Sequence, residues 1–363
     1  MTKNYPYDKI FKISSRISAI CVTEINMQKT KRTIAALTAL LILIGATLCS
    51  CKQNKDENDI PESECVMTVS GHEVSYGLYR YFFLNYKSEY SSDQIAADPD
   101  AVYSQIEEKT ISSIKGMYAL IDFCAEHGIT TSDPSVKQSV EQTINNIKAQ
   151  YADEKTDKSG EKGYAEELKR NFMTDSVLRF VSAVDACETE LFTKLLRDGT
   201  LPSDDAKLKE IIEGEEFIRV LQIYVSLENG ENYETNKQLA QKVYADAMAG
   251  KDFDSLISDY SNDYTMTKNG YYICHGYMNE KFEQAAYSLN VGEISGIVEL
   301  PDGFHIIRRY EKENSYIEEH LEDLAEQYQT CLFYNMLDER EATVTYEKKD
   351  VFSSIDPALI AIK

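Results

Sequence analysis

The sequence predicts an α+β protein in which a mainly helical module is interrupted by a smaller domain of antiparallel sheet and surrounding helices. Apolar residues recur at helical spacing through residues 101–195 and again through residues 315–341. Between these stretches, residues 296–300 and 304–310 flank the turn sequence Pro301-Asp302-Gly303. Because Pro-Asp-Gly between apolar runs joins paired strands, the interrupting segment is predicted to contain a sheet.

Residues 1–51 are predicted to direct export rather than to fold. A basic segment, residues 29–32, precedes an apolar run, residues 33–48, that is too short to span a bilayer. The run ends in Leu48-Cys49-Ser50-Cys51, which resembles a bacterial lipobox, so cleavage before Cys51 would leave a lipid-anchored cysteine. Met27 is the more natural start of such a signal, and residues 1–26 are interpreted as an overlong gene prediction. The predicted location is the outer leaflet of a bacterial cell membrane, facing the extracytoplasmic side.

The charge of the chain disfavours two classes of partner. The full sequence has 38 basic and 61 acidic residues. Residues 1–50 hold seven of the basic and two of the acidic ones, which leaves the remainder with 31 basic and 59 acidic residues, a net charge of −28. This balance argues against nucleic acid and against a basic patch for anionic lipid headgroups.

The cysteines after the lipobox do not have the spacing of a disulfide framework or of a metal site. They are odd in number, far apart, and mostly lie in helical patterns: Cys65, Cys124, Cys187, Cys274 and Cys331. Neither a disulfide framework nor a zinc site has this spacing. Buried free thiols are predicted, with no metal and no cofactor.

The N-terminal module is predicted over residues 65–215, after an acidic linker at residues 52–64. Residues 66–74 alternate around Ser-Gly as in a hairpin, and Ser75 caps the next helix. That helix carries an aromatic stripe at Tyr79, Phe82, Phe83, Tyr86 and Tyr90. Core packing explains the stripe, and a groove for unfolded chains is the alternative for the surplus aromatic residues on its other faces.

Further helices follow in this module. Residues 111–124 form a helix closed by Gly128, and Asp133-Pro134 starts a second helix with Val136, Val140 and Ile144 on one face. Residues 153–163 are predicted as a charged loop, and residues 164–195 as another helix.

The interrupting domain begins with a strand near residues 219–225. Residues 253–260 then have helical spacing, with Asp252 as N-cap and Gly250 ending the preceding helix. In the final strand, alternation places His305 on the face of Ile307, opposite Phe304 and Ile306.

Residues 216–312 resemble the parvulin (PpiC) family of peptidyl-prolyl cis/trans isomerases. The resemblance lies in an ordered succession of motifs: FDSLISDYS at 253–261, GYMNEKFEQAAYSL at 276–289, GEIS at 292–295 and GFHII at 303–307. The order of hairpin, helices and isomerase-like domain resembles exported foldases of the PrsA and SurA types. In that arrangement residues 313–363 return as a helix and a strand that pack on the N-terminal module.

The resemblance implies a set of site residues. Met278 and Phe282 match the positions that hold the proline ring, and Tyr272 falls near the third pocket position. The polar cluster of the family maps onto Gln222, Asp263, Asp302 and His305. Gln222 stands where the family has a histidine and, unlike histidine, cannot change its charge near neutral pH. Asp302, in its Pro-Asp-Gly setting, is also interpreted as a solvated turn residue.

The function implied is that of an exported, lipid-anchored foldase. It would catalyse cis/trans isomerisation of X-Pro bonds in unfolded or partly folded secreted proteins, with reduced activity because of Gln222, and would also act as a chaperone. Foldases of this architecture can form homodimers. The alternative is a catalytically inactive chaperone or binding module that keeps the parvulin shape.

Overall fold

The computed structural model describes residues 58–153, 155–227 and 232–361. The predicted lipidation site, Cys51, and the rest of the predicted signal lie outside the described residues. The described residues divide into two compact units, one holding those from 58 to 194 and from 336 onward, the other holding those from 195 to 335. No helix among the described residues is both long enough and apolar enough to cross a membrane.

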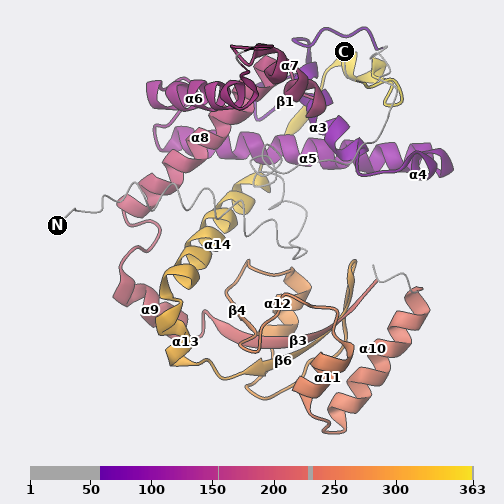
Figure 1. Cartoon of the computed structure of the whole chain (residues 1–363), viewed down its shortest axis with the longest axis vertical. Coiled ribbons are helices and arrows are strands. Elements are labelled where there is room, and N and C mark those ends of the chain that lie inside the picture. The colour runs from indigo at the N-terminus through magenta and orange to yellow at the C-terminus, as the bar shows by residue number, and fades with distance from the viewer. Residues whose placement is uncertain (1–57, 154, 228–231, 362–363) are drawn as a thin grey trace. The chain divides into compact units, whose positions relative to one another are not determined.

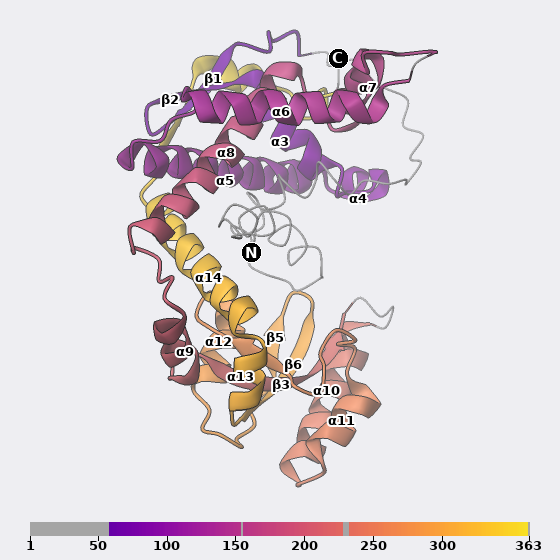
Figure 2. The same ribbon diagram turned by 60° about the vertical axis from the view of Figure 1, so that its left-hand side comes forward.

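The first unit is mainly helical (Figure 2). Its elements are β1 (Cys65–Val69), β2 (His72–Ser75), α3 (Tyr76–Lys87), α4 (Ser92–Ala97), α5 (Pro99–Glu126), α6 (Pro134–Tyr151), α7 (Glu161–Arg170), most of α8 (Asp175–Arg197), β7 (Tyr346–Lys348) and the 3-10 helix η1 (Asp350–Ser354). The helix α5 is the longest of them, and α3 and α4 lie against it.

The N-terminal hairpin is confirmed. Strands β1 and β2 pair antiparallel, and Ser70 and Gly71 in the turn adopt positive φ angles of 48° and 84°. The Ser75 hydroxyl accepts a hydrogen bond from the Leu78 N–H, as expected of an N-cap. Strand β7 pairs antiparallel with β1, so the C-terminal strand completes this three-stranded sheet.

The aromatic residues of α3 belong to the core. Residues 76–84 are all buried, including those on the sides of the helix such as Tyr76 and Tyr81. Core packing is therefore the correct interpretation of Tyr79, Phe82 and Phe83, whereas Tyr86 is half-buried and Tyr90, also half-buried, lies beyond the end of the helix at Lys87. The alternative of an aromatic groove along this helix is wrong, because these faces are covered by the protein itself.

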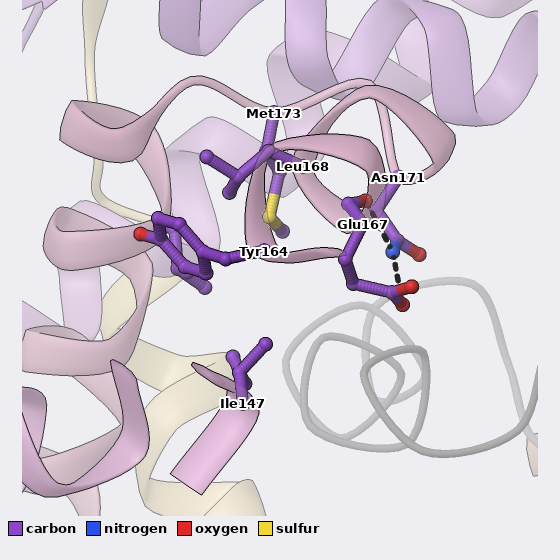
Figure 3. A pocket seen from close by; sticks show the side chains of 7 residues that line it. Ile147, Tyr164, Glu167, Leu168, Asn171 and Met173 are labelled. Carbon is purple, nitrogen blue, oxygen red and sulfur yellow. Dashed lines mark hydrogen bonds between the residues drawn. The ribbon is translucent and has the colours of Figure 1, made fainter. Parts of the chain in front are cut away.

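The predicted helix over residues 164–195 is broken in two. Helix α7 ends where the side-chain amide of Asn171 donates to the Glu167 carbonyl oxygen at 2.9 Å and Phe172 takes a φ of +60°. A residue in the left-handed region stops a helix, and neither glycine nor proline marks this end in the sequence. Figure 3 shows the small apolar hollow at this break, with Ile147, Tyr164 and Met173 among its lining residues.

The cysteines meet in pairs that the sequence does not suggest. The five thiols among the described residues are free, and four of them are buried. The thiol of Cys124 interacts with that of Cys187, and the thiol of Cys274 interacts with that of Cys331. The interaction with Cys331 and burial raise the pKa of the Cys274 thiol. The prediction of buried free thiols is confirmed for all but Cys65, which is partly exposed.

Helix α8 contains a carboxyl group that should make stability depend on pH. Burial raises the pKa of Asp185 from 3.8 to about 6. A carboxyl group whose pKa is higher in the folded state stabilises the fold at low pH, and that stabilisation is lost as the pH rises from about 4 to about 6. Asp185→Asn should therefore raise the free energy of unfolding at pH 8 by up to about 3 kcal/mol, with no gain near pH 4.

Urea unfolding of Asp185→Asn at pH 4 and pH 8 measures this difference. Asp175, on the same helix, is a control of opposite sign, because hydrogen bonds from Tyr164 and Arg179 lower the pKa of its carboxyl group. Asp175→Asn should lower stability at pH 8. If Asp185→Asn raised the free energy of unfolding equally at pH 4 and pH 8, the raised pKa assigned to Asp185 would be contradicted.

The second unit holds a four-stranded antiparallel sheet with surrounding helices (Figure 1). Its elements are α9 (Asp205–Glu213), β3 (Ile218–Ser226), α10 (Tyr233–Met248), α11 (Phe253–Tyr260), β4 (Tyr271–Ile273), α12 (Glu280–Tyr287), β5 (Val298–Leu300), β6 (Gly303–Tyr310), α13 (Asn314–Glu319) and most of α14 (Leu321–Glu341). The strand order is β4-β3-β6-β5.

Different helices pack against the two faces of this sheet. On one face, Ile223 and Ile306 pack against residues of α10 and α11. On the other, Val220 and Ile307 pack against residues of α12. The alternation predicted for the last strand is confirmed, as is the helix that begins after its N-cap, Asp252.

The α+β prediction is therefore confirmed. The predicted helix over residues 315–341 is present as two helices, α13 and α14, separated at His320. The closing strand lies at residues 346–348 rather than 342–346, because α14 continues to Glu341 and its last turn occupies the following residues.

Candidate functional site

The pairing of β3 with β6 brings two predicted site residues together. Gln222 lies opposite Ile307, and His305 lies opposite Tyr224, so Gln222 and His305 are diagonal neighbours on the face covered by α12. His305 Nδ1 is 2.8 Å from Gln222 Oε1. The Gln222 amide Nε2 in turn donates to Asp263 Oδ2 at 2.7 Å.

Asp263 is held in the loop after α11 by its own hydrogen bonds. Its Oδ1 accepts from the backbone N–H groups of Thr265 and Met266, both at 3.1 Å, and from the Thr265 hydroxyl at 2.8 Å. These donors turn the loop back on itself and aim Oδ2 at the sheet. The carboxylate therefore serves as an anchor rather than as a free charge.

The hydrogen bonds fix the direction of this chain of groups. An ionised carboxylate only accepts, so Gln222 must present its NH2 group to Asp263 and its oxygen to His305. His305 Nδ1 must then carry a hydrogen and donate a hydrogen bond to Gln222 Oε1, an assignment that follows from the network. Gln222 thus transmits a fixed orientation from Asp263 to His305.

Asp302 lies at the other end, in the turn between β5 and β6. Its Oδ1 is 3.5 Å from His305 Nε2, and its side chain is 11% exposed. The interpretation of Asp302 as a solvated turn residue is wrong, because the turn folds its carboxylate toward His305. Gly303 permits this, since a Cβ there would lie 2.3 Å from the Val225 carbonyl oxygen. We call Asp263, Gln222, His305 and Asp302 the polar row.

His305 is enclosed by aromatic rings. Tyr224 stacks on it with ring centres 4.8 Å apart and an interplanar angle of 18°. Phe282 meets it edge to face, at 5.8 Å and 87°. The imidazole is only 5% exposed, so in this structure it lies beneath the surface.

The two predicted pocket residues on or beside α12 lie in one apolar cluster. Met278 and Phe282 belong to it together with Ile273, Leu300 and Ile307. The Glu283 carboxylate accepts from the N–H groups of Gly276 and Met278, at 3.0 Å and 2.7 Å, which holds the loop in front of the helix.

This cluster is nearly covered in the structure. Met278 is 9% exposed and Phe282 is 3% exposed. Half-buried tyrosines, including Tyr271 and Tyr277, pack against the same cluster. A proline ring can therefore reach Met278 and Phe282 only after a neighbouring side chain has moved.

The structure does not bring Tyr272 to this cluster, and its predicted place in the pocket is corrected. Tyr272 packs on the opposite side with Phe217 and Ile317, and its hydroxyl accepts from the Glu313 N–H at 2.9 Å. Tyr271 is the residue that packs against the pocket cluster. Successive residues of a strand face opposite sides, so a register error of one residue exchanges the two tyrosines.

Gly270 fixes that register. It has a φ of +69°, and a Cβ on it would lie 2.4 Å from the Val220 carbonyl oxygen, so only glycine allows β4 to approach β3 this closely. Sequence reasoning missed Tyr271 and Tyr224. Tyr224 could have been predicted from the sequence, because it lies two residues after Gln222 and must share its face of the strand.

A catalytic or metal pair of Cys274 and His275 finds no support. Cys274 is buried with Phe217 and Cys331, whereas His275 stacks on Tyr287 with ring centres 3.9 Å apart. Across the described ranges, no group of three or more His, Cys, Asp or Glu side chains could hold a metal ion.

Comparison with known proteins identifies this domain. The family described as "Rotamase: PPIC-type PPIASE domain" matches residues 221–311. Residues 221–311 belong to the PPIC-type peptidyl-prolyl isomerase family. The matched range of this PPIase domain contains the polar row, Met278 and Phe282, so the predicted parvulin resemblance is confirmed.

The wider chain is similar to foldases. It is 26% identical to the foldase protein PrsA of Caldanaerobacter subterraneus, over 75% of this chain and 81% of that protein. It is 31% identical to PrsA of Bacillus subtilis, over 35% of this chain and 42% of that protein. These relatives and the PPIase domain support a foldase or chaperone role.

Solved structures of related proteins are also similar. A PrsA peptidylprolyl isomerase from Bacillus anthracis matches with a TM-score of 0.34 and 18% identity, over 62% of this chain and 94% of that one. A SurA-like chaperone from Campylobacter jejuni matches with a TM-score of 0.28 and 12% identity, over 79% of this chain and 99% of that one.

Proposed function

We propose that this protein is an exported, lipid-anchored foldase that catalyses cis/trans isomerisation of X-Pro bonds in secreted proteins. One observation carries the proposal: the Phe282 ring meets His305 edge to face, so an apolar cluster and an ordered row of polar groups adjoin on one face of the sheet. This is the combination that amide rotation requires.

The chemistry needs no nucleophile and no metal. Rotation about an X-Pro bond faces a barrier of roughly 20 kcal/mol because the amide loses its conjugation at the twisted midpoint. The planar amide is more polar than the twisted one, so apolar surroundings raise the planar form relative to the twisted form. Met278 and Phe282 supply those surroundings for the proline ring.

The polar row supplies a fixed electrostatic background. Its hydrogen bonds are already made in the absence of a client, so its dipoles do not have to reorganise while the amide turns. In this mechanism Asp263, Gln222 and His305 position one another, and Met278 and Phe282 contact the proline.

We extend the proposal to the whole chain. Residues 65–215 together with 313–363 would form a helical chaperone module that holds unfolded secreted proteins, and residues 216–312 the isomerase domain. The apolar run at residues 33–48 and the lipobox-like sequence ending at Cys51 support export and lipid anchoring. The net charge of −28 without residues 1–50 suits a soluble body held at the membrane by lipid.

A protease-coupled assay on proline-containing tetrapeptides tests the isomerase. The wild-type protein should accelerate cis/trans conversion. Gln222→His should raise kcat/KM by about tenfold, because an imidazole can donate to Asp263 and accept from His305 as Gln222 does, and can also change its charge. Gln222→Leu, which removes both hydrogen bonds, should lower it. Absence of acceleration in both the wild type and Gln222→His would contradict the isomerase proposal.

The second candidate is a chaperone without isomerase activity. The low exposure of Met278 and Phe282 favours it, as does glutamine at position 222. It predicts that the purified protein suppresses aggregation of an unfolded client while leaving the tetrapeptide rate unchanged. The two assays together therefore separate the candidates.

A further inference from the structure

Tyr271 connects the two parts of the candidate site. Its ring packs against the cluster that contains Met278 and Phe282. Its hydroxyl lies 2.8 Å from Asp263 Oδ2, the oxygen that also accepts from Gln222 Nε2 at 2.7 Å. One side chain therefore contacts both the apolar cluster and the polar row.

The hydroxyl of Tyr271 acts as a donor to Asp263. Burial raises the pKa of Tyr271 above its ordinary value of 10, which keeps the proton on the oxygen. The hydroxyl of Thr265 lies 2.9 Å from the Tyr271 hydroxyl and donates its own hydrogen bond to Asp263 Oδ1 at 2.8 Å. The Tyr271 proton is thus directed to Oδ2.

The two oxygens of Asp263 are fixed in different ways. Three donors of the loop, from Thr265 and Met266, hold Oδ1. Only Tyr271 and Gln222 are seen to donate to Oδ2 among the described residues. Rotation about the terminal torsion of an aspartate is soft, so loss of the Tyr271 bond would leave Gln222 alone to orient Oδ2.

We propose that Tyr271 is a positioning residue of the isomerase site: its hydroxyl fixes the Asp263 carboxylate, which sets the Gln222 amide and thereby the protonated nitrogen of His305. The kinetic consequence rests on the proposed isomerase function. The effect on the His305 ring does not, and it can be measured on a protein without activity.

Tyr271→Phe tests the proposal, because it removes one oxygen and keeps the ring. We expect kcat to fall by about five- to tenfold while KM changes less than about twofold, since the apolar contacts remain. In 15N NMR spectra of labelled protein, the His305 Nδ1–H signal should shift and exchange faster with solvent.

Tyr287→Phe is the matched control. Tyr287 is half-buried and packs against the same cluster, but its hydroxyl donates to the carbonyl oxygens of Glu216 and Ile273. Removal of the Tyr287 hydroxyl should alter the stability of the fold and leave kcat and the His305 signals unchanged. Equal effects of the two variants on kcat and on His305 would overturn the proposal.

A double-mutant cycle adds a second criterion. If Tyr271 acts through Gln222, Tyr271→Phe should cause no further loss in a Gln222→Leu background. Additive losses would overturn the proposal. If the wild type shows no isomerase activity, the proposed function fails but the NMR comparison still decides: unchanged His305 signals in Tyr271→Phe would overturn the positioning role, and shifted signals would support it.

Discussion

Phe282→Ala should lower kcat/KM for X-Pro isomerisation by about 100-fold, the largest effect expected of a single side chain at this site. The ring lies in the apolar cluster with Met278 and meets His305 edge to face at 5.8 Å. Its removal takes away both the surface for the proline ring and one wall of the His305 enclosure. The protease-coupled tetrapeptide assay measures the loss.

Truncation of a buried ring also destabilises a fold, by about 3–5 kcal/mol, and this effect must be separated from the loss of the pocket. Phe304→Ala is the control, because Phe304 is equally buried on the opposite face of the same sheet, with Val225 and Ala240. Both variants are assayed at a temperature at which circular dichroism shows them folded. A comparable loss in Phe304→Ala would contradict the pocket assignment.

The same variant decides how clients are held. An aggregation-suppression assay with Phe282→Ala should show undiminished holding if the helical module binds unfolded chains. Loss of suppression in parallel with loss of isomerisation would locate client binding at the Met278 and Phe282 cluster instead.

Asp263→Asn should reverse the polar row and lower kcat/KM by about 10- to 100-fold, as a wrong histidine tautomer does in other enzymes. The three loop donors would keep the amide oxygen of the new asparagine, so its NH2 group would face Gln222. Gln222 would then turn its oxygen to the asparagine and its NH2 group to His305. His305 Nδ1 would become an acceptor and lose its proton.

The 15N chemical shifts of His305 measure this reversal directly. Nδ1 should be protonated in the wild type and unprotonated in Asp263→Asn. Asp259→Asn, on the exposed side of the preceding helix α11, is the matched control and should change neither the shifts nor the rate. Protonated Nδ1 in both proteins would show that Asp263 does not set the orientation of the row.

Local signals in the sequence were sufficient for several elements. Asp252 and Gly250 mark the start of α11 and the end of α10, and Pro301 and Gly303 mark the turn before β6. The resemblance to the family placed Gln222, Asp263 and His305, and in the structure Gln222 lies within hydrogen-bonding distance of both Asp263 and His305. Their donor and acceptor directions required coordinates, because Gln222 offers one of each.

Other features depend on contacts that no local pattern records. Strand β4 is only three residues long, so alternation cannot tell which of Tyr271 and Tyr272 faces the pocket. The end of α7 depends on Phe172, whose positive φ is rarely adopted by a phenylalanine and leaves no signal in the sequence. The thiol pairs join cysteines from elements distant in sequence, such as Cys124 on α5 and Cys187 on α8.

The pairing of β7 with β1 has a consequence for the order in which the chain can mature. Hairpin β1–β2 exposes an unpaired edge until residues 346–348 arrive, whereas the described part of the second unit lies entirely within residues 195–335. As the chain is made from its N-terminus, the second unit can acquire its structure before the hairpin pairs with its third strand. We therefore expect the pairing of β7 with β1 to form late in folding, and truncation before residue 346 to leave the edge of β1 unpaired.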